Sequence, residues 1–224
     1  MSDYHISIKF KESFGGEAFK KLADSIRVTD AYTIEAWLVP ANVTQEGPAR
    51  IISYSASPTD RNVTLGQTLY NYNFAQRSSG TNANGEPLLS TADADEILQA
   101  TQQHVAITYN ALDGRRLYVN GELVASETDT ANENLNDWDD SYLLLLGAET
   151  DGSNAWLGKY RMVAIHDQAL TQEQVQQNMD AGVGERYFLL FNIDEWVDVP
   201  DSYIVIEGSQ FDNHSYLFHT PRYV

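Results

Sequence analysis

Paired carboxylates are the first groups to consider, because two of them flanking a glycosidic bond can hydrolyse it. A retaining enzyme holds these carboxyl groups roughly 5 to 5.5 Å apart, a separation that acids two positions apart on one strand face provide. Two pairs with this spacing lie where predicted strands run into loops: Glu127 with Asp129, and Glu149 with Asp151. Two more lie outside the predicted strands, in a polar stretch and in a loop: Asp93 with Asp95, and Asp137 with Asp139. Glu35 has no acidic neighbour on its predicted strand. We therefore predict that the chain is not an enzyme.

Other catalytic patterns are missing from the sequence. The chain has no cysteine and therefore no thiol nucleophile. No G-x-S-x-G, H-E-x-x-H or glycine-rich phosphate loop occurs in it. His104 and His166 fall within predicted strands. We expect these two histidines to be structural groups with satisfied hydrogen bonds.

Hard oxygen ligands gather in residues 134–140, which read NLNDWDD. Calcium takes about six to eight oxygens, and flexible acidic loops supply them. The loop does not follow the EF-hand pattern, because no glycine occupies its sixth position. We predict a calcium site formed by Asp137, Asp139, Asp140 and Glu149. The alternative is a solvated turn in which these side chains cap backbone N–H groups.

Aromatic side chains next to amides suggest a platform for sugar rings. An aromatic face stacks on the apolar face of a pyranose, while amide and carboxylate groups orient its hydroxyls. The predicted ligand-binding residues are Tyr70, Asn71, Tyr72 and Trp138. Aromatics on strands also fill cores, and for Tyr72 the core alternative is favoured.

The last residues of the chain are dense in aromatics, which are enriched at interface centres. We predict an interface formed by Trp196, Phe211, Tyr216 and Phe218. An unpaired strand edge here would invite pairing with another subunit. The alternative is that these segments close the sandwich of the same molecule.

The charge balance limits the partners of the protein. Lys and Arg total 14 against 32 Asp and Glu, for a formal net charge of −18. Nucleic-acid binding needs a basic surface, so we predict no nucleic-acid partner. No apolar run approaches the length of a membrane span, so we predict no membrane insertion. Residues 1–10 lack the pattern of a secretory signal. We nevertheless expect a place outside cells or on a virion surface rather than in the cytoplasm.

Period-two alternation of apolar and polar residues dominates the chain and predicts strands. Asn120-Gly121 is a strong hairpin signal, because both turn positions must tolerate positive φ. The predicted strands cover residues 32–39, 49–55, 68–77, 104–110, 116–119, 122–127, 142–146 and 156–166. The last of these has apolar groups on both faces at 162–165, which predicts burial on both sides.

Helix is expected at only two places. Residues 171–181 begin with Thr171 and carry Gln174 three positions later, which is a capping-box pattern. A shorter helix is expected over 17–24. Three further strands are expected at 187–192, 203–207 and 215–218. The chain is therefore predicted to be an all-β, antiparallel two-sheet sandwich with one short C-terminal helix. We divide it into a sandwich over 1–185 and a β-rich extension over 186–224, which alternatively forms part of the same sandwich.

Residues 26–182 resemble bacterial laminin G-like, concanavalin A-like lectin/glucanase jelly-roll domains. The motifs that carry the resemblance are, in chain order, YTIEAW at 32–37, ARIISY at 49–54, RNVTLG at 61–66, RLYVNGELV at 116–124, WDDSY at 138–142 and VAIHD at 163–167. The resemblance implies a jelly-roll fold, often found as an adhesive or carbohydrate-binding module. Fold alone does not settle function.

Two functions remain open at this point. The first is a non-catalytic recognition module that binds a glycan or a protein surface, assisted by calcium. The second is a structural, decoration or adhesion component of a virion or surface assembly, which would bind copies of itself or virion proteins. The resemblance favours the first function. The aromatic residues of the extension over 186–224, called the tail below, favour the second.

Overall fold

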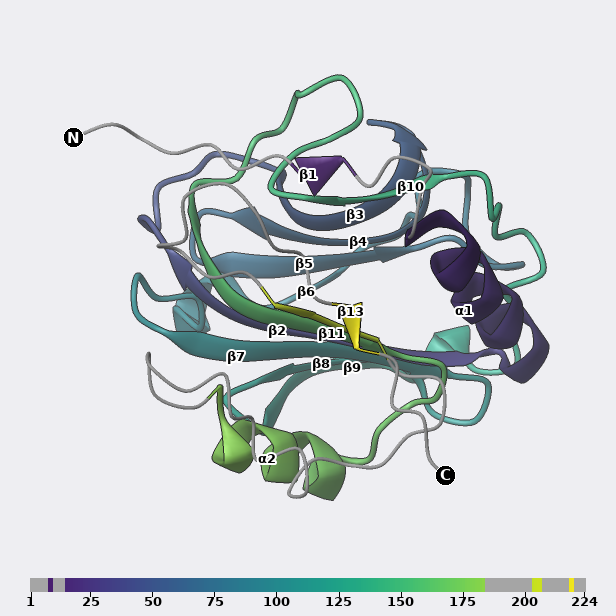
Figure 1. Cartoon of the computed structure of the whole chain (residues 1–224). Helices are drawn as coiled ribbons and strands as arrows, with labels where there is room; N and C mark the ends of the chain where they lie inside the picture. Colours follow the sequence, from purple (N-terminus) through teal and green to yellow (C-terminus); the bar gives the residue numbers. More distant parts are fainter. Residues whose placement is uncertain (1–7, 10–14, 184–202, 207–217, 220–224) are drawn as a thin grey trace.

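Two antiparallel sheets face each other in this computed structural model, which describes residues 8–9, 15–183, 203–206 and 218–219 (Figure 1). One sheet has six strands in the order β1, β10, β3, β4, β5, β6. Their bounds are Ile8–Lys9, Leu143–Leu146, Ala49–Ser57, Asp60–Thr68, Asn71–Gln76 and Leu89–Ser90. The predicted antiparallel jelly-roll sandwich is confirmed.

The second sheet has seven strands in the order β13, β12, β11, β2, β7, β8, β9. Their bounds are Phe218–His219, Tyr203–Ile206, Gly158–His166, Ala31–Pro40, Gln103–Asn110, Gly114–Val119 and Glu122–Glu127. Two α-helices, α1 (Gly15–Thr29) and α2 (Gln172–Ala181), accompany the sheets, with short 3-10 turns η1 (Asp93–Asp95) and η2 (Thr128–Thr130). Among the described residues, no helix is long and apolar enough to cross a membrane.

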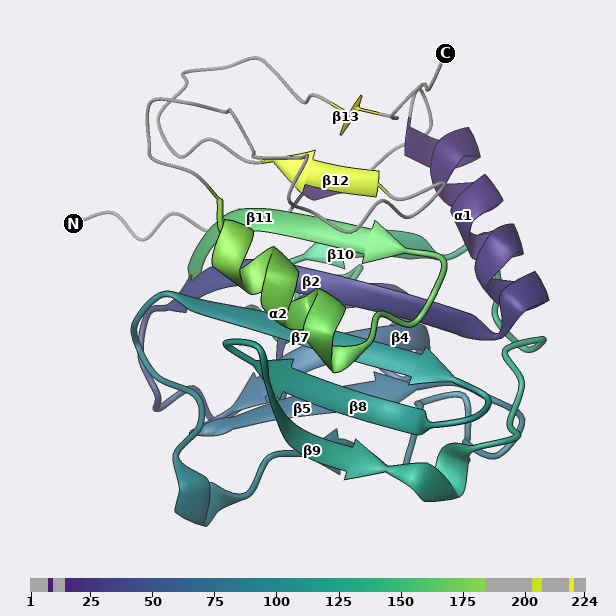
Figure 2. The same cartoon turned by 90° about the horizontal axis from the view of Figure 1, so that it is seen from below.

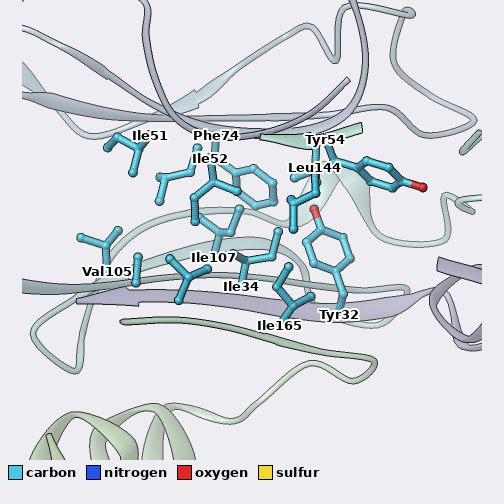
Figure 3. Packing of buried hydrophobic residues seen from close by; sticks show 14 of the residues in the cluster. Tyr32, Ile34, Ile51, Ile52, Tyr54, Phe74, Val105, Ile107, Leu144 and Ile165 are labelled. Carbon is cyan, nitrogen blue, oxygen red and sulfur yellow. The ribbon is translucent and has the colours of Figure 1, made fainter. Parts of the chain in front are cut away.

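Strand alternation builds the core between the sheets. Figure 3 shows Ile51, Ile52, Tyr54, Phe74 and Leu144 of the six-stranded sheet reaching toward the labelled side chains of the seven-stranded sheet: Tyr32, Ile34, Val105, Ile107 and Ile165. All of these residues are buried. Burial of each such side chain contributes roughly 1.5–3 kcal/mol.

The seven-stranded sheet is buried on its outer face as well, where α2 lies across it (Figure 2). On β11, Val163 and Ile165 join the main core, while Met162 and Ala164 pack with Trp37 on the opposite face. The prediction that this strand is buried on both sides is confirmed. This outer layer is where a buried polar cluster forms.

Local sequence signals account for the turns and the second helix. Asn120 and Gly121 have φ values of 51° and 82°, as the hairpin signal requires. At the start of α2, Thr171 Oγ1 accepts from Gln174 N at 3.3 Å, and Gln174 Oε1 accepts from Thr171 N at 2.9 Å. This reciprocal pair is the predicted capping box.

Several element bounds differ from the predictions, and two of the differences have a clear physical cause. Helix α1 reaches Thr29 because Leu22, Ala23 and Ile26 form one buried stripe that runs past the predicted end. The strand predicted over 68–77 is confirmed only over Asn71–Gln76, which is β5. The chain reverses at Leu69, whose φ is 52°, so that Tyr70 lies in the turn between β4 and β5.

Two short segments of the tail extend the seven-stranded sheet. β12 pairs with β11, as in Val163 opposite Val205, and β13 pairs with β12. Trp196, Phe211 and Tyr216 of the predicted interface lie outside the described residues. For Phe218 only the backbone is described, opposite Val205.

Candidate ligand-binding surface

An exposed aromatic lies at the tip of the β4–β5 hairpin. Tyr70 is 36% exposed, and the preceding Leu69 is 39% exposed. Two backbone hydrogen bonds fix this turn, because Leu69 N donates to Gln45 O at 2.7 Å and Leu98 N donates to Tyr70 O at 3.0 Å. The turn is therefore held between two loops and presents the ring of Tyr70 from an ordered backbone.

Two asparagines follow on the outward face of β5, opposite the core side chains of that strand. Asn71 Nδ2 donates to a carboxylate oxygen of Asp93, and Asn71 Oδ1 accepts from Thr91 Oγ1 at 3.1 Å. Asn73 Nδ2 donates to Ser90 Oγ at 2.9 Å. Among the described residues, nothing donates to Asn73 Oδ1, although that atom is buried.

We name the set formed by Tyr70, Asn71, Asn73, Ser90 and Asp93 the Tyr70 surface. It combines an apolar ring with amide, hydroxyl and carboxylate groups, which is the chemistry that orients a sugar. The structure thus brings together Tyr70 and Asn71 of the predicted ligand residues.

The other two predicted ligand residues are core residues. Tyr72 is fully buried, and its hydroxyl donates to Gln103 Oε1 at 2.7 Å. Trp138 is 3% exposed, and its Nε1 donates to Arg77 O at 2.8 Å. Neither ring can stack on a ligand that approaches from solvent. The prediction that Tyr72 and Trp138 bind a sugar is therefore wrong. Alternation favoured the core for Tyr72, but no local pattern revealed the burial of Trp138 within its polar loop.

The acidic loop forms caps and ion pairs. Asp139 Oδ1 accepts from the backbone N of Ser141 at 2.8 Å and from its Oγ at 2.6 Å. These bonds, first the one from the Ser141 hydroxyl, lower the pKa of the Asp139 carboxyl. Asp140 pairs with Lys20 Nζ at 3.0 Å, and Asp137 is exposed.

Glu149 is separate from that loop and fully buried. Its carboxylate lies 2.5 Å from Arg50 Nε and accepts from Ser55 Oγ at 2.7 Å and Ser53 Oγ at 3.2 Å. Within the described part of the chain, no three His, Asp or Glu side chains are placed to share a metal ion. The predicted four-residue calcium site is therefore corrected to an Asx-capped turn and a buried ion pair.

A polar cluster that the sequence did not reveal lies between β2 and α2. Glu35 Oε1 lies 3.1 Å from His104 Nε2, and Oε2 lies 3.0 Å from His166 Nε2. Asn178 Nδ2 of α2 donates to Oε2 at 2.8 Å. His104 lies on β7 opposite Trp37 of β2, and His166 lies on β11 opposite Thr33 of β2. Trp37 and Thr33 are two positions either side of Glu35, so both histidines are diagonal neighbours of Glu35.

The electrostatics of this cluster favour an ionised carboxylate. Burial alone would raise the pKa of Glu35, but the hydrogen bonds and charges of His104 and His166 lower it to about 2. None of the side chains in the cluster is more than 2% exposed. The cluster therefore joins α2 to the sheet and is closed to a substrate. Both histidines are buried and contact Glu35 through Nε2, as expected of structural groups. The expectation of satisfied hydrogen bonds is confirmed only in part, because among the described residues His104 Nδ1 is buried with no partner.

A match to a known protein family shows where this chain belongs. The family model described as the concanavalin A-like lectin/glucanases superfamily, of the laminin G type, matches residues 14–176. The chain belongs to this superfamily. The resemblance predicted from residues 26–182 is confirmed. No curated protein sequence gives a match.

Solved structures extend the comparison of the superfamily fold. A putative carbohydrate binding protein from Bacteroides ovatus is 20% identical with a TM-score of 0.50, over 70% of this chain and 42% of that one. The CBM40 of a Ruminococcus gnavus sialidase, bound to α2,3-sialyllactose, is 16% identical with a TM-score of 0.50, over 65% and 80%. NanB with Optactamide is 16% identical with a TM-score of 0.54, over 77% of this chain and 26% of that one. Similarity at this level shows the fold alone.

Proposed function

We propose that this chain is a non-catalytic module that binds a glycan at the Tyr70 surface. The observation that carries the proposal is the exposed ring of Tyr70 beside the outward amides of Asn71 and Asn73. Membership of a superfamily of lectins and glucanases supports a carbohydrate ligand. The Ruminococcus CBM40 structure with a bound glycan and the description of the Bacteroides protein further support a carbohydrate as the broad class of ligand, without bearing on its charge.

The placement of the candidate acids supports a binding role over a catalytic one. Glu35 and Glu149 are fully buried in hydrogen-bonded clusters. Glu127 pairs with the buried guanidinium of Arg115. A glycosidase needs two carboxylates that reach the bond being cleaved, and these three acids are committed to other contacts. Asp93 and Asp95, which are exposed beside Tyr70, lie in the 3-10 turn η1 and not on one face of a strand.

A glycan array followed by titration of the best ligand tests this proposal. We expect Tyr70→Ala to weaken binding by roughly tenfold, which corresponds to the loss of one aromatic contact. Tyr70→Phe keeps the ring and should retain most of the affinity. Leu112→Ala is the matched control, because Leu112 is 89% exposed in the turn after β7.

The array is run with calcium and with chelator, because calcium assistance remains a prediction. Binding to no glycan under either condition would reject the proposed function. So would binding that Tyr70→Ala and Leu112→Ala affect equally, since the ligand would then lie elsewhere.

The alternative function, assembly of a virion or surface layer, remains a prediction. So does the expected place outside cells or on a virion. The predicted interface depends on side chains outside the described residues. Light scattering over a range of protein concentrations tests the assembly function, and a monomer at all concentrations would contradict it.

A further inference from the structure

The charged side chains of the segments around the Tyr70 surface are all negative. Backbone hydrogen bonds join residues 42–47, 67–73 and 88–98, because Leu69 N donates to Gln45 O, Thr91 N to Tyr72 O and Leu98 N to Tyr70 O. These three segments contain no Lys, Arg or His. Their acids are all exposed: Glu46, Asp93, Asp95 and Glu96.

The arginines at the start of β3 and β4 do not balance this charge. Arg50 is 6% exposed and forms an ion pair with Glu149. Arg61 is 2% exposed, donates to Pro58 O, and has its pKa lowered to about 10 by burial. Both guanidinium groups are buried, so neither offers a bidentate contact to an anionic ligand at the surface.

We infer that the Tyr70 surface selects neutral glycans and rejects their sialylated or sulfated counterparts. This inference rests on the proposed function and names its ligand class. Recognition of a sugar carboxylate or sulfate relies on cationic or aligned N–H donors, whereas the three segments around Tyr70 supply exposed carboxylates. Like charges brought together without a partner oppose binding and so create specificity.

The repulsion that each exposed acid exerts on an anionic ligand is modest, and the contributions of the four acids add up. One carboxylate about 8 Å from a ligand anion weakens binding roughly twofold in water at low salt. We therefore expect a sialylated glycan to bind roughly five- to tenfold more weakly than its neutral counterpart at low salt. The difference should shrink at high salt, because exposed charges are screened.

Matched pairs of array glycans that differ only in one terminal sialic acid or sulfate test the inference. The double variant Asp95→Asn/Glu96→Gln should leave the affinity for the neutral glycan unchanged and raise the affinity for the anionic one roughly fourfold. The control Asp137→Asn removes one exposed acid beyond the other end of β4, where Asp139 N donates to Asn62 Oδ1. That acid lies roughly 20 Å along the strand from Tyr70, beyond the screening length.

The outcomes separate the two proposals. The inference is supported if the protein prefers neutral glycans, if Asp95→Asn/Glu96→Gln weakens that preference, and if the control variant keeps it. Equal or tighter binding of the sialylated glycan, still lost in Tyr70→Ala, overturns the inference and leaves the proposed function intact. If no glycan of either kind binds, the proposed function itself fails.

Discussion

The side-chain amide of Asn178 on α2 donates to the buried carboxylate of Glu35 on β2 at 2.8 Å. This bond joins the helix to the middle of the seven-stranded sheet. His104 and His166 complete the set of donors around the carboxylate. A buried charge is tolerated where such donors satisfy it. The cluster therefore fixes the position of a short helix that buries few apolar side chains of its own: Leu170, just before it, and Val175.

Glu35→Gln is expected to destabilise the protein by about 2–4 kcal/mol, because it removes the charge that both histidines contact. Denaturant unfolding measures the free energy of unfolding directly. Glu122→Gln on β9 is the matched control, since Glu122 is exposed and should change stability by less than about 0.5 kcal/mol. Equal effects of the two substitutions would contradict a structural role for the cluster.

The free energy of unfolding should fall at acid pH, because the Glu35 carboxylate becomes protonated there. The pKa of Glu35 is lowered from 4.5 to about 2 in the folded chain. A lowered pKa means that its stabilisation is fully present above about pH 4.5 and is lost as the pH falls through 2. The linked contribution is of the order of 3 kcal/mol.

Stability curves for the wild type and Glu35→Gln between pH 6 and pH 2 isolate this contribution. The groups that face the carboxylate are His104 on β7, His166 on β11 and Asn178 on α2. We expect the difference in the free energy of unfolding between the two proteins to shrink toward pH 2. A constant difference would show that Glu35 does not titrate in this range.

Loss of the Asp139 cap should be independent of calcium. Asp139→Ala removes two hydrogen bonds to Ser141 and should cost about 1 kcal/mol. Asp140→Ala removes a partly exposed ion pair with Lys20 and a longer one, of 3.7 Å, with Arg27, and should cost less. We expect the same fall in Tm with calcium and with chelator. A fall confined to the calcium-loaded protein would restore a metal site in this loop.

The sequence predicts the fold better than it predicts the sites. Alternation and the Asn120-Gly121 turn depend on local backbone geometry, so the strands and the hairpin follow from the residues themselves. The predicted calcium set failed because contacts between distant segments decide the partner of a carboxylate. Glu149 pairs with Arg50 on β3, 99 positions earlier in the chain.

Glu35 shows a second limit of the sequence pattern. On an exposed sheet face an isolated outward glutamate is unremarkable, and its neighbours His104 and His166 lie on two other strands. Only the position of α2 makes that face an interior. One signal was available, because three polar residues all fell within otherwise apolar strand cores: Glu35, His104 and His166.

Two glycines provide a last test of the structure, because both have a positive φ and they differ in surroundings. Gly114 at the start of β8 has a φ of 74°, and a Cβ there would lie 2.2 Å from the backbone O of Glu127. Gly152 has a φ of 82°, and a Cβ there would meet nothing within 4 Å. Gly152→Ala should therefore cost about 1 kcal/mol of backbone strain alone.

Gly114→Ala adds a clash with backbone that cannot move without breaking the β8–β9 pairing, so we expect a loss of about 3 kcal/mol or more. Thermal unfolding of both variants measures the difference. Similar Tm values for the two would mean that β9 does not approach Gly114 as closely as the structure places it. A large gap would support this register, which also places Arg115 opposite Glu127.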